Sequence, residues 1–501
     1  MAEKAIIIGA GIGGLMSAMA LGHAGFDVTV LDRDPPPPDT SPDDVFENWQ
    51  HSGVGHVRHS HAFLARLYVL IRDKYPELLD DLLSAGCRIL PFENMIPEVS
   101  RAGFTPRPSD DNLNILTSRR TTLELIMRRF VERLPHVRIE PGVKVRSLET
   151  RRNGAGQITV TGLSGDLADG TKQEWRPDFI VDASGKNAPA MDWLKEAGLE
   201  IEEESEPTGI LYFTRHYRLR DGQNEPDRGS SPTSGDLGYI KFGIFPADNR
   251  RFSVTLAIPE IEMELRKAAV DPAVFDRICL SMPGMAPWVD PDRSEPVSRV
   301  FGMGELISRW RHMVKDGQPK VLNYFPVGDC VIRTNPLYGR GCSFAAISAH
   351  LLGEALTASS DPAARARLYH ESVARELRPF YDSMVSQDQT AIKRARNTLD
   401  PDYRPRLKAR LLKSFIEDGI VIATRADVNM LRRVMAAFHM MEAPNAWLKE
   451  PANFARVLMY WARGKWLNAK YYPANIGPER DRLFATLELS VNADLQRLNA
   501  A

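Results

Sequence analysis

The chain has 501 residues, of which 43% are apolar and 26% charged, and its formal net charge at pH 7 is −1. This balanced charge gives no indication of a nucleic acid or of a strongly acidic partner. The four cysteines are scattered without a C-x-x-C pair, which argues against a disulfide framework and against a zinc site. No run of about 18 uncharged apolar residues occurs, and the first expected strand begins too early for a cleavable signal sequence. The sequence therefore predicts a cytoplasmic protein of two or three structural units without a transmembrane segment.

Residues 5–32 carry the strongest pattern in the chain. Runs of apolar and small residues predict a strand, a helix and a second strand, over 5–8, 15–23 and 28–31. Gly9, Gly11 and Gly14 have the G-x-G-x-x-G spacing, which permits a sharp turn, close approach of a pyrophosphate and close helix–strand packing. Asp32 follows the second strand, where a carboxylate can accept ribose hydroxyls. This stretch predicts a dinucleotide-binding unit whose helix N-terminus faces a phosphate.

The next part of the chain alternates helices and strands. Four prolines at 35–38 form a stiff segment, and the residues from Asp39 to Gly55 are typical of a surface loop. Hydrophobic spacing then predicts helices over 62–75, 78–85 and 121–134, and strands over 137–140, 143–148, 157–163 and 174–182.

From residue 208 onward the pattern becomes rich in β segments. We expect strands over 210–218, 237–245 and 251–258, with a loop over 221–234, and therefore an antiparallel sheet that forms a separate lobe. A helix over 261–282, broken near Asp271, follows. The remaining elements are a strand over 321–327 and helices over 342–356, 363–383, 389–397, 405–415, 427–441 and 451–460.

Three distant segments, 9–32, 178–185 and 321–341, share a strand followed by a turn. In the third segment, Asp329 directly follows the strand and can accept a sugar-chain hydroxyl. The backbone N–H groups after Gly339 can face an electron-rich ring edge. A nicotinamide dehydrogenase needs only the first of these sites, whereas a flavin, which is longer and buried, needs anchoring at both ends.

These motifs resemble those of the FAD-dependent monooxygenases of the aromatic-hydroxylase and squalene-epoxidase type, and most of all the bacterial branch that includes polyether epoxidases. The matching stretches are GAGIGGL at 9–15, RHSH at 58–61, SRRTTLE at 118–124, DFIVDASG at 178–185 and VGDCVIRTNPLYGRG at 327–341. The resemblance covers residues 1–356. It implies an α/β fold of three parts. A Rossmann-type FAD-binding domain with a parallel sheet comprises 1–206 and 296–356, and an interleaved antiparallel β-sheet substrate domain comprises 207–295. A C-terminal helical region comprises 357–501.

The resemblance also implies how FAD is held. The glycine turn and Asp32 hold the AMP half, and Arg120 meets the pyrophosphate region. Asp329 binds the ribityl chain, and the helix from Cys342 points at the N1–C2 edge of the flavin ring. The complete set of implied cofactor-binding residues is Gly9, Gly11, Ile12, Gly13, Gly14, Asp32, Arg33, Arg58, Arg120, Val145, Asp182, Ala183, Gly185, Gly328, Asp329, Pro336, Gly339, Gly341 and Cys342.

Two positions depart from the family pattern. The residues after Gly185 are Lys186-Asn187-Ala188-Pro189 instead of the S-x-x-R ending usual in aromatic hydroxylases that use NADPH. The electron donor is therefore either NAD(P)H or a separate flavin reductase. Arg340 stands where relatives often carry glutamine. Its guanidinium can stabilise reduced or peroxyflavin anions or can pair with a carboxylate, and we favour the pairing.

The candidate catalytic residues are Arg340, His61 and Tyr338. His59 and His61 either satisfy hydrogen bonds of the backbone or the flavin lobe, which we favour, or one of them donates a proton near the flavin. No metal site is expected from His56, His59 and His61, because carboxylate neighbours are missing and the family needs no metal. The candidate substrate contacts, for which ordinary sheet packing is the alternative, are Tyr212, Arg215, Tyr217, Tyr239 and Phe245.

The C-terminal region combines aromatic residues and methionines with Lys and Arg between them. Most of these apolar positions are expected in the core, and a lid or a membrane-surface face for a lipophilic substrate is the alternative. They include Phe438, Met440, Met441, Trp447, Met459, Trp461 and Trp466.

No Ser-His-Asp constellation or reactive cysteine is visible, so the difficult chemistry is assigned to the cofactor. The leading hypothesis is an FAD-dependent monooxygenase that hydroxylates or epoxidises a lipophilic or aromatic small molecule with molecular oxygen, through a flavin C4a-hydroperoxide. The first alternative is a flavin-dependent reductase or dehydrogenase of prenyl-type double bonds, because GYIKFGIFP at 238–246 resembles a strand of geranylgeranyl reductases. A flavin-dependent halogenase is less favoured because the W-x-W-x-I-P segment is absent, and a binding module without redox turnover is the remaining alternative.

Overall fold

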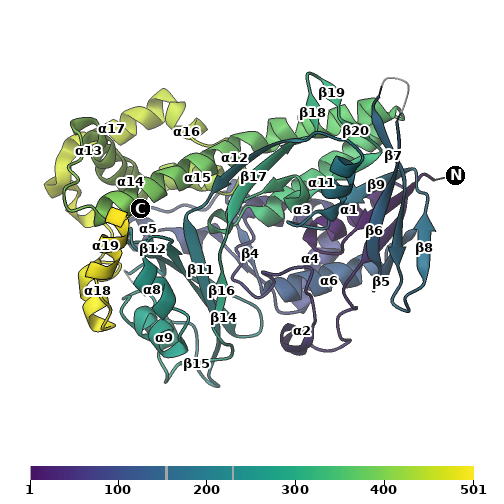
Figure 1. The fold of residues 1–501 in the computed structure, drawn as a ribbon. Coiled ribbons are helices and arrows are strands. Elements are labelled where there is room, and N and C mark those ends of the chain that lie inside the picture. Colours follow the sequence, from purple (N-terminus) through teal and green to yellow (C-terminus); the bar gives the residue numbers. More distant parts are fainter. Residues whose placement is uncertain (1, 153–155, 228–230, 501) are drawn as a thin grey trace.

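A parallel sheet forms the centre of the half of the molecule that contains the N-terminus (Figure 1). The computed structural model describes residues 2–152, 156–227 and 231–500. The strand order is β21, β9, β1, β2, β5, and each neighbouring pair runs parallel. These strands are β1 (Lys4–Ile8), β2 (Asp27–Asp32), β5 (Val137–Pro141), β9 (Phe179–Asp182) and β21 (Tyr324–Pro326). Because parallel strands end at the same edge of a sheet, the turns after β1, β2, β9 and β21 lie close together.

Helices cover this sheet and bury its apolar strands. In β1 the run from Ala5 to Ile8 is buried, as expected for a central strand. α1 (Ile12–His23) packs against α11 (Gly341–Ala358), and α6 (Arg120–Glu132) packs against α1. The other helices before residue 200 are α2 (Pro42–Asn48), α3 (Ala65–Lys74), α4 (Pro76–Ser84), α5 (Glu98–Arg101) and α7 (Pro189–Glu196).

An antiparallel sheet and three helices form a second unit, here called the β lobe. Its strands follow the order β12, β13, β14, β11, β15, and β16 also pairs with β11. They are β11 (Ile210–Leu219), β12 (Ser234–Asp236), β13 (Lys241–Pro246), β14 (Arg251–Pro259), β15 (Ser294–Pro296) and β16 (Phe301–Met303). The helices are α8 (Met263–Ala268), α9 (Pro272–Leu280) and α10 (Ala286–Val289).

The two faces of β11 have different surroundings. Phe213 and Tyr217 enter the apolar core of the β lobe, together with residues of α9. Thr214 and His216, which alternate with them, contact the loop before α3: Thr214 Oγ1 lies 3.1 Å from His59 Nδ1, and His216 Nε2 donates to the Arg58 carbonyl oxygen at 2.8 Å. The even-numbered residues of β11 therefore face the half that holds the parallel sheet.

The other strands form smaller sheets. β3 (Arg88–Leu90) pairs with β4 (Ile115–Thr117), and β18 (Val314–Lys315) pairs with β19 (Gln318–Pro319). One sheet contains β6 (Lys144–Arg152), β7 (Ile158–Asp166), β8 (Lys172–Trp175) and β20 (Val321–Leu322). Another contains β10 (Glu202–Pro207), β17 (Ile307–His312) and β22 (Ile332–Arg333).

The C-terminal region is helical and packs on both halves. Tyr369 and Leu377 of α12 (Pro362–Leu399) join the core of the parallel-sheet half. Leu483 and Phe484 of α18 (Arg480–Thr486) join the core of the β lobe. Within the described chain, no helix is long and apolar enough to cross a membrane. The other helices are α13 (Leu407–Ser414), α14 (Val421–Ala426), α15 (Val428–Phe438), α16 (Ala446–Lys449), α17 (Pro451–Asn468) and α19 (Asn492–Ala500).

Two sequence predictions about β and loop segments need correction. The stretch 174–182 is not one strand, because β8 pairs with β7 whereas β9 joins the parallel sheet, and Pro177 lies between them. The expected surface loop before Gly55 contains α2, whose N-cap Ser41 accepts a hydrogen bond from the Asp44 N–H at 3.2 Å.

A third correction concerns the long C-terminal helix. The helices predicted over 363–383 and 389–397 are one helix, α12, which continues through Pro379. The predicted loop over 221–234 includes residues 228–230, which lie outside the described residues.

Candidate functional site

The turn after β1 has a geometry that requires glycine. Gly9 has a φ of 97°, and a Cβ there would lie 2.7 Å from the Ala183 carbonyl oxygen. A Cβ on Gly14 would lie 1.8 Å from the Gly9 carbonyl oxygen, so no side chain fits at this position. The Gly9 N–H donates to the Leu31 carbonyl oxygen at 2.8 Å, which holds the turn against the end of β2. α1 therefore begins at this edge of the sheet with its N–H groups free for an anion.

The three segments that the sequence singled out meet at this turn. A Cβ on Gly13 would lie 3.7 Å from the Cβ of Ala345, near the start of α11. It would also lie 3.8 Å from the Cβ of Ala183 and 3.8 Å from a methyl group of Val327. Residues 178–185 and 321–341 thus reach the glycine turn, and the predicted convergence is confirmed.

Asp329 lies in the short turn η3 (Gly328–Cys330) directly after β21. Gly328 has a φ of 63°, which turns the chain at this point. The Asp329 carboxylate makes no hydrogen bond or ion pair with the described part of the chain, although Arg309 binds its backbone carbonyl oxygen at 3.1 Å. Burial raises the pKa of Asp329, and the positive charge of Arg120 opposes this rise. Both carboxylate oxygens are therefore available to hydroxyl donors.

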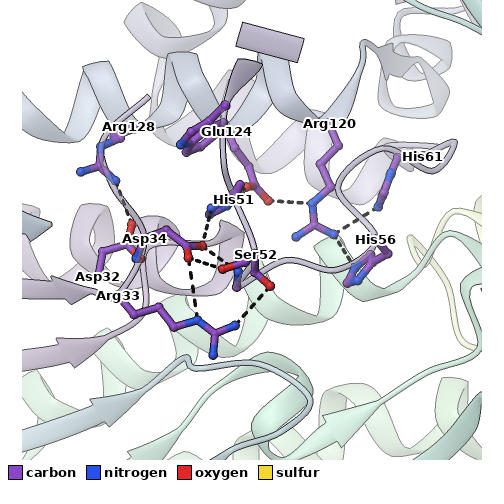
Figure 2. A network of polar contacts seen from close by, with 12 residues as sticks. Asp32, Arg33, Asp34, His51, Ser52, His56, His61, Arg120, Glu124 and Arg128 are labelled. Atoms are coloured by element: carbon purple, nitrogen blue, oxygen red, sulfur yellow. Dashed lines mark hydrogen bonds and ion pairs between the residues drawn. The ribbon is translucent and has the colours of Figure 1, made fainter. Parts of the chain in front are cut away.

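A buried chain of alternating charges connects the residues after β2 with α6 and with the loop before α3 (Figure 2). The imidazole of His51 lies between two carboxylates, 3.0 Å from Asp34 and 2.8 Å from Glu124. Arg120 Nε donates to the other Glu124 oxygen at 2.6 Å. Arg120 Nη1 lies 2.7 Å from His56 Nε2 and 3.1 Å from His61 Nε2.

The charges of this chain follow from its contacts. Burial lowers the pKa of His51, but its hydrogen bonds to Asp34 and Glu124 outweigh burial and raise it to about 9. Burial raises the pKa of Glu124, but the charges of Arg120 and His51 outweigh burial and lower it to about 2. His51 is thus cationic at neutral pH, and a continuous series of ion pairs leads from Asp34 to Arg120.

His61 is a neutral acceptor in this chain. Its Nδ1 lies 2.8 Å from the His59 carbonyl oxygen, which can only accept, so Nδ1 carries the proton and Nε2 accepts from Arg120. Burial and the charge of Arg120 lower the pKa of His61 to about 3. The favoured interpretation, in which these histidines satisfy hydrogen bonds, fits this geometry better than proton donation does. In the described chain no group of three or more His, Cys, Asp or Glu residues could hold a metal ion.

The turn before α11 is fixed by buried polar contacts. The Asn335 side chain accepts a hydrogen bond from the Tyr212 hydroxyl at 2.5 Å and donates to Asp388 of α12 at 2.8 Å. The Tyr338 hydroxyl also donates to Asp388, at 2.9 Å. Gly339 has a φ of 63°, where only glycine is unstrained, and a Cβ there would lie 3.2 Å from a backbone oxygen.

Arg340 differs from the sequence expectation. Its guanidinium has no carboxylate partner in the described chain and donates to the Phe380 carbonyl oxygen at 3.1 Å. It lies over the rings of Tyr338 and Phe380, at 5.6 and 5.4 Å from their centres. Burial lowers the pKa of Arg340 to about 10. The favoured pairing with a carboxylate is therefore wrong, because α12 covers this position with a carbonyl oxygen and a ring instead of an acid.

The candidate substrate contacts divide between the two faces of the β lobe. Tyr212 faces the turn before α11, as shown by its bond to Asn335. Phe245 pairs with Ser253, whose hydroxyl contacts Ser60 at 2.6 Å, so Phe245 lies on the same face.

The other three candidates do not face this turn, and their predicted role as substrate contacts needs correction. Arg215 and Tyr217 both bind Asp276 of α9, on the opposite face of β11. Tyr239 lies in the β-lobe core, and its hydroxyl donates to the Pro478 carbonyl oxygen. Both faces of β11 carry polar as well as aromatic residues, so the sequence did not indicate which face lies toward the turn before α11.

Several of the predicted cofactor-binding residues have protein partners. Asp32 is buried and accepts a hydrogen bond from Arg128 at 3.0 Å, and Asp182 accepts hydrogen bonds from Tyr324 and from the Ser184 N–H. The guanidinium of Arg58 donates to backbone carbonyl oxygens at and after the end of α2.

Arg33 and Val145 lie at the margins of this region. Arg33 is half-exposed and donates to the Ser52 carbonyl oxygen, and Val145 is a half-buried residue of β6. Their roles toward a cofactor stay predictions.

Sequence reasoning missed Asp388, His51 and Glu124. Asp388 belongs to the tail that the resemblance covers only loosely, and no local pattern marks it. It lines a small cavity of about 20 Å³ between the β lobe, the turn before α11 and α12, which is enough for a water molecule. Glu124 lies in the matched stretch SRRTTLE, four residues after Arg120, and this spacing could have indicated their ion pair.

The comparisons with known proteins agree with this geometry. The family model of an NAD(P)-binding Rossmann-like domain matches residues 7–63. The myxobacterial chondrochloren halogenase CndH, an FAD-dependent halogenase, superposes with a TM-score of 0.57 and 17% identity, covering 89% of this chain and 98% of its own. The p-nitrophenol 4-monooxygenase PnpA from Pseudomonas putida DLL-E4 superposes with a TM-score of 0.57 and 15% identity, covering 88% and 98%.

The comparisons identify the fold of this chain. The chain has the fold of the FAD-dependent monooxygenase superfamily, and the predicted α/β fold class is confirmed. In sequence it is similar to Protein Rv3254 of Mycobacterium tuberculosis, at 25% identity over 366 residues that cover 71% of this chain and 73% of that protein. A halogenase and a monooxygenase share this fold, so the fold alone does not determine the reaction.

Proposed function

We propose that this protein is an FAD-dependent oxidoreductase, and specifically a monooxygenase that hydroxylates or epoxidises a lipophilic or aromatic small molecule with molecular oxygen. One observation carries this proposal: the glycine turn at the start of α1 and the start of α11 are in contact, around Gly13 and Ala345. An elongated dinucleotide can therefore have its nucleotide end at the first helix and its ring end at the second.

The residues present fit FAD at both ends. Gly9 and Gly14 permit the tight turn and the close start of α1, and Gly11 between them has no side chain where a pyrophosphate would approach the backbone. Asp329 holds a carboxylate without a protein partner where a ribityl chain would pass. The N-terminus of α11, preceded by Gly339, would face the ring edge and stabilise negative charge there. Asp32 would accept ribose hydroxyls through the lone pairs that Arg128 and the Asp34 N–H leave free.

The chain's own residues would bind and orient the cofactor and would stabilise negative charge. Bound FAD supplies the redox chemistry, because it accepts two electrons and passes them to oxygen. Arg120 would place a buried positive charge near the pyrophosphate, in a position fixed by Glu124. Arg340 would add a cation without a carboxylate partner at the turn before α11.

No activated nucleophile supports a different chemistry at this site. Burial raises the pKa of the Cys342 thiol to about 11, so the thiol stays protonated at neutral pH. His61 is neutral and accepts from Arg120. The facing surface of the β lobe offers apolar surface, through Phe245, beside the turn that the buried Tyr212–Asn335 hydrogen bond holds in place. These groups can position a substrate and exclude water.

A flavin-dependent halogenase is the second candidate, because the halogenase CndH and the brominase Bmp2 share this fold at TM-scores of 0.57 and 0.54. The first test is whether the purified protein is yellow and loses its colour with dithionite. Oxygen consumption that depends on an organic substrate, with NAD(P)H or a flavin reductase as the donor, would support the monooxygenase. Turnover that also requires bromide or chloride would support the halogenase. Reduction of a double bond without oxygen would support a reductase of prenyl-type double bonds.

A further inference from the structure

Two C-terminal segments, residues 404–413 and 451–470, carry a surface that is both apolar and basic, here called the basic–apolar patch. Trp466 is 87% exposed and Leu407 is 69% exposed, although both side chains are large and apolar. α13 has no buried residue. Exposed apolar side chains in and next to these segments are Leu407, Leu411, Leu412, Ile416, Phe454, Leu458, Met459, Trp466 and Leu467. Apolar side chains that gather in this way mark an interaction surface.

The two segments of the patch lie side by side. The Trp461 indole of α17 donates a 3.0 Å hydrogen bond to Ser414 at the end of α13. The ring of Phe415 packs on Phe454 and Trp461 of α17, with centre distances of 6.1 and 5.4 Å. Figure 1 shows α13 and α17 together at the end of the molecule that lies far from the N-terminus. Gly464 has a φ of 70°, so α17 kinks just before its most exposed residues.

The charge of the patch is of one sign. Residues 404–413 contain five Lys or Arg residues and 451–470 contain four, and neither segment contains Asp or Glu. Of the acids next to these segments, Glu417 pairs with Lys413 at 3.8 Å, Asp418 with Lys465 at 3.9 Å, and Asp427 with Arg456, whereas Asp400 and Asp402 form no ion pair with the described chain. Arg406, Lys408 and Arg410 form no ion pair with the part of the chain that the structure describes.

This combination decides which partner fits. Three of the nine cations are paired with acids, so a second copy of the chain would bring the other six to the same surface, and their repulsion would oppose a symmetric dimer. A membrane surface that contains anionic lipids satisfies both properties, since its phosphates pair with the cations and its headgroup layer accepts Trp and Leu side chains. No helix of the described chain can cross a membrane, so binding would be confined to the surface.

We propose that the basic–apolar patch binds the surface of membranes that contain anionic lipids, with Trp466, Leu467 and the leucines of α13 inserted at the level of the headgroups. Arg406, Lys408 and Arg410 pair with lipid phosphates. The proposal rests only on the exposed side chains and charges of the C-terminal helices. It stands or falls independently of the proposed cofactor and reaction.

The test is co-sedimentation of the full-length protein with vesicles of phosphatidylglycerol and phosphatidylcholine, compared with vesicles of phosphatidylcholine alone. We expect binding to the anionic vesicles that weakens with salt, together with a blue shift of tryptophan emission. Lys408→Gln and Arg410→Gln each lower the affinity about fivefold. Leu412→Ser with Trp466→Ser lowers the affinity further and abolishes most of the blue shift.

The matched control is Val270→Ser with Leu280→Ser, because these side chains are 55% and 46% exposed on the β lobe, outside the patch. This control variant binds the vesicles as the parent does. The proposal is overturned if the parent does not sediment with anionic vesicles at low salt, or if the patch and control variants bind equally. A dimer of the parent that the patch variant converts to a monomer, measured by analytical ultracentrifugation, would identify a second copy as the partner and would also overturn it.

Discussion

The hydroxyl of Tyr212 donates a 2.5 Å hydrogen bond to Oδ1 of Asn335 and thereby joins the β lobe to the turn before α11. The same oxygen accepts the Leu337 N–H at 3.0 Å, and the Asn335 amide donates to Asp388 of α12 at 2.8 Å. One buried asparagine thus connects the β lobe, the turn and the C-terminal region. The side chains around it fix how the β lobe covers the proposed flavin ring site.

Tyr212→Phe removes this connection. We expect the free energy of unfolding in urea to fall by about 1 kcal/mol, because one buried hydrogen bond is lost while Asn335 keeps its other partners. We also expect slower substrate-dependent oxygen consumption. Tyr217→Phe is the control, since it loses a hydrogen bond to Asp276 on the opposite face of β11. If both variants reduce turnover equally, Tyr212 has no special role at the site.

The His51 imidazolium makes the stability depend on pH. Its pKa in the folded chain is raised to about 9 from an ordinary 6.5, so its contribution is fully present below pH 6.5 and is lost as pH rises through 9. This contribution is of order 3 kcal/mol. In His51→Gln the unfolding free energy should be lower at pH 6 and should lack this decline between pH 6.5 and 9. Urea unfolding at several pH values measures it, and identical pH profiles would contradict the charged state of His51.

Gly14→Ala should disrupt the glycine turn, because the new Cβ would lie 1.8 Å from a backbone oxygen. We expect a loss of unfolding free energy of about 2 kcal/mol or more, together with loss of bound FAD. Gly302→Ala is the matched control, because a Cβ there meets open space. It should change stability by less than about 0.5 kcal/mol and should retain FAD. Equal behaviour of the two variants would contradict the described geometry of the turn.

Arg340→Gln tests whether this buried cation acts on the flavin. Because a positive charge stabilises an anionic reduced flavin, its removal should make the reduction potential of bound FAD more negative by about 30 mV, equivalent to about 1.4 kcal/mol for two electrons. Arg340→Lys keeps the charge and should restore most of the potential. An unchanged potential in Arg340→Gln would leave Arg340 with only its contacts to Tyr338 and Phe380.

The sequence predicted the parallel-sheet half better than it predicted the chemistry beside it. Local patterns determine the glycine turn and the strands that end at one edge, and the structure places Gly13 beside Ala345 accordingly. The partners of long side chains depend on packing between distant elements, so the sequence did not indicate that Arg340 lies under α12 without an acid. The sequence also did not determine which face of β11 lies toward the turn before α11. Tyr212 and Arg215 are on opposite faces of this strand, and a shift of one residue in its pairing would exchange the two faces.

The C-terminal helices show the same limit. The long α12 was predicted as two helices, and Asp388 on it had no pattern to mark it as a partner of Asn335. The aromatic residues of the tail were expected mainly in the core. Trp447 is buried, whereas Trp466 is 87% exposed, and hydrophobic spacing alone cannot distinguish the two.

The measurement that tests the central claim most directly is the FAD content of purified Asp329→Ala after gel filtration, compared with the parent and with Asp32→Ala. Asp192→Ala is the control, because this side chain is 70% exposed on α7. We predict that the parent and the control retain FAD, whereas Asp329→Ala and Asp32→Ala lose most of it, since one carboxylate would anchor the ribityl chain and the other the ribose. If both variants retain FAD as the parent does, the placement of the cofactor along the edge of the parallel sheet is wrong.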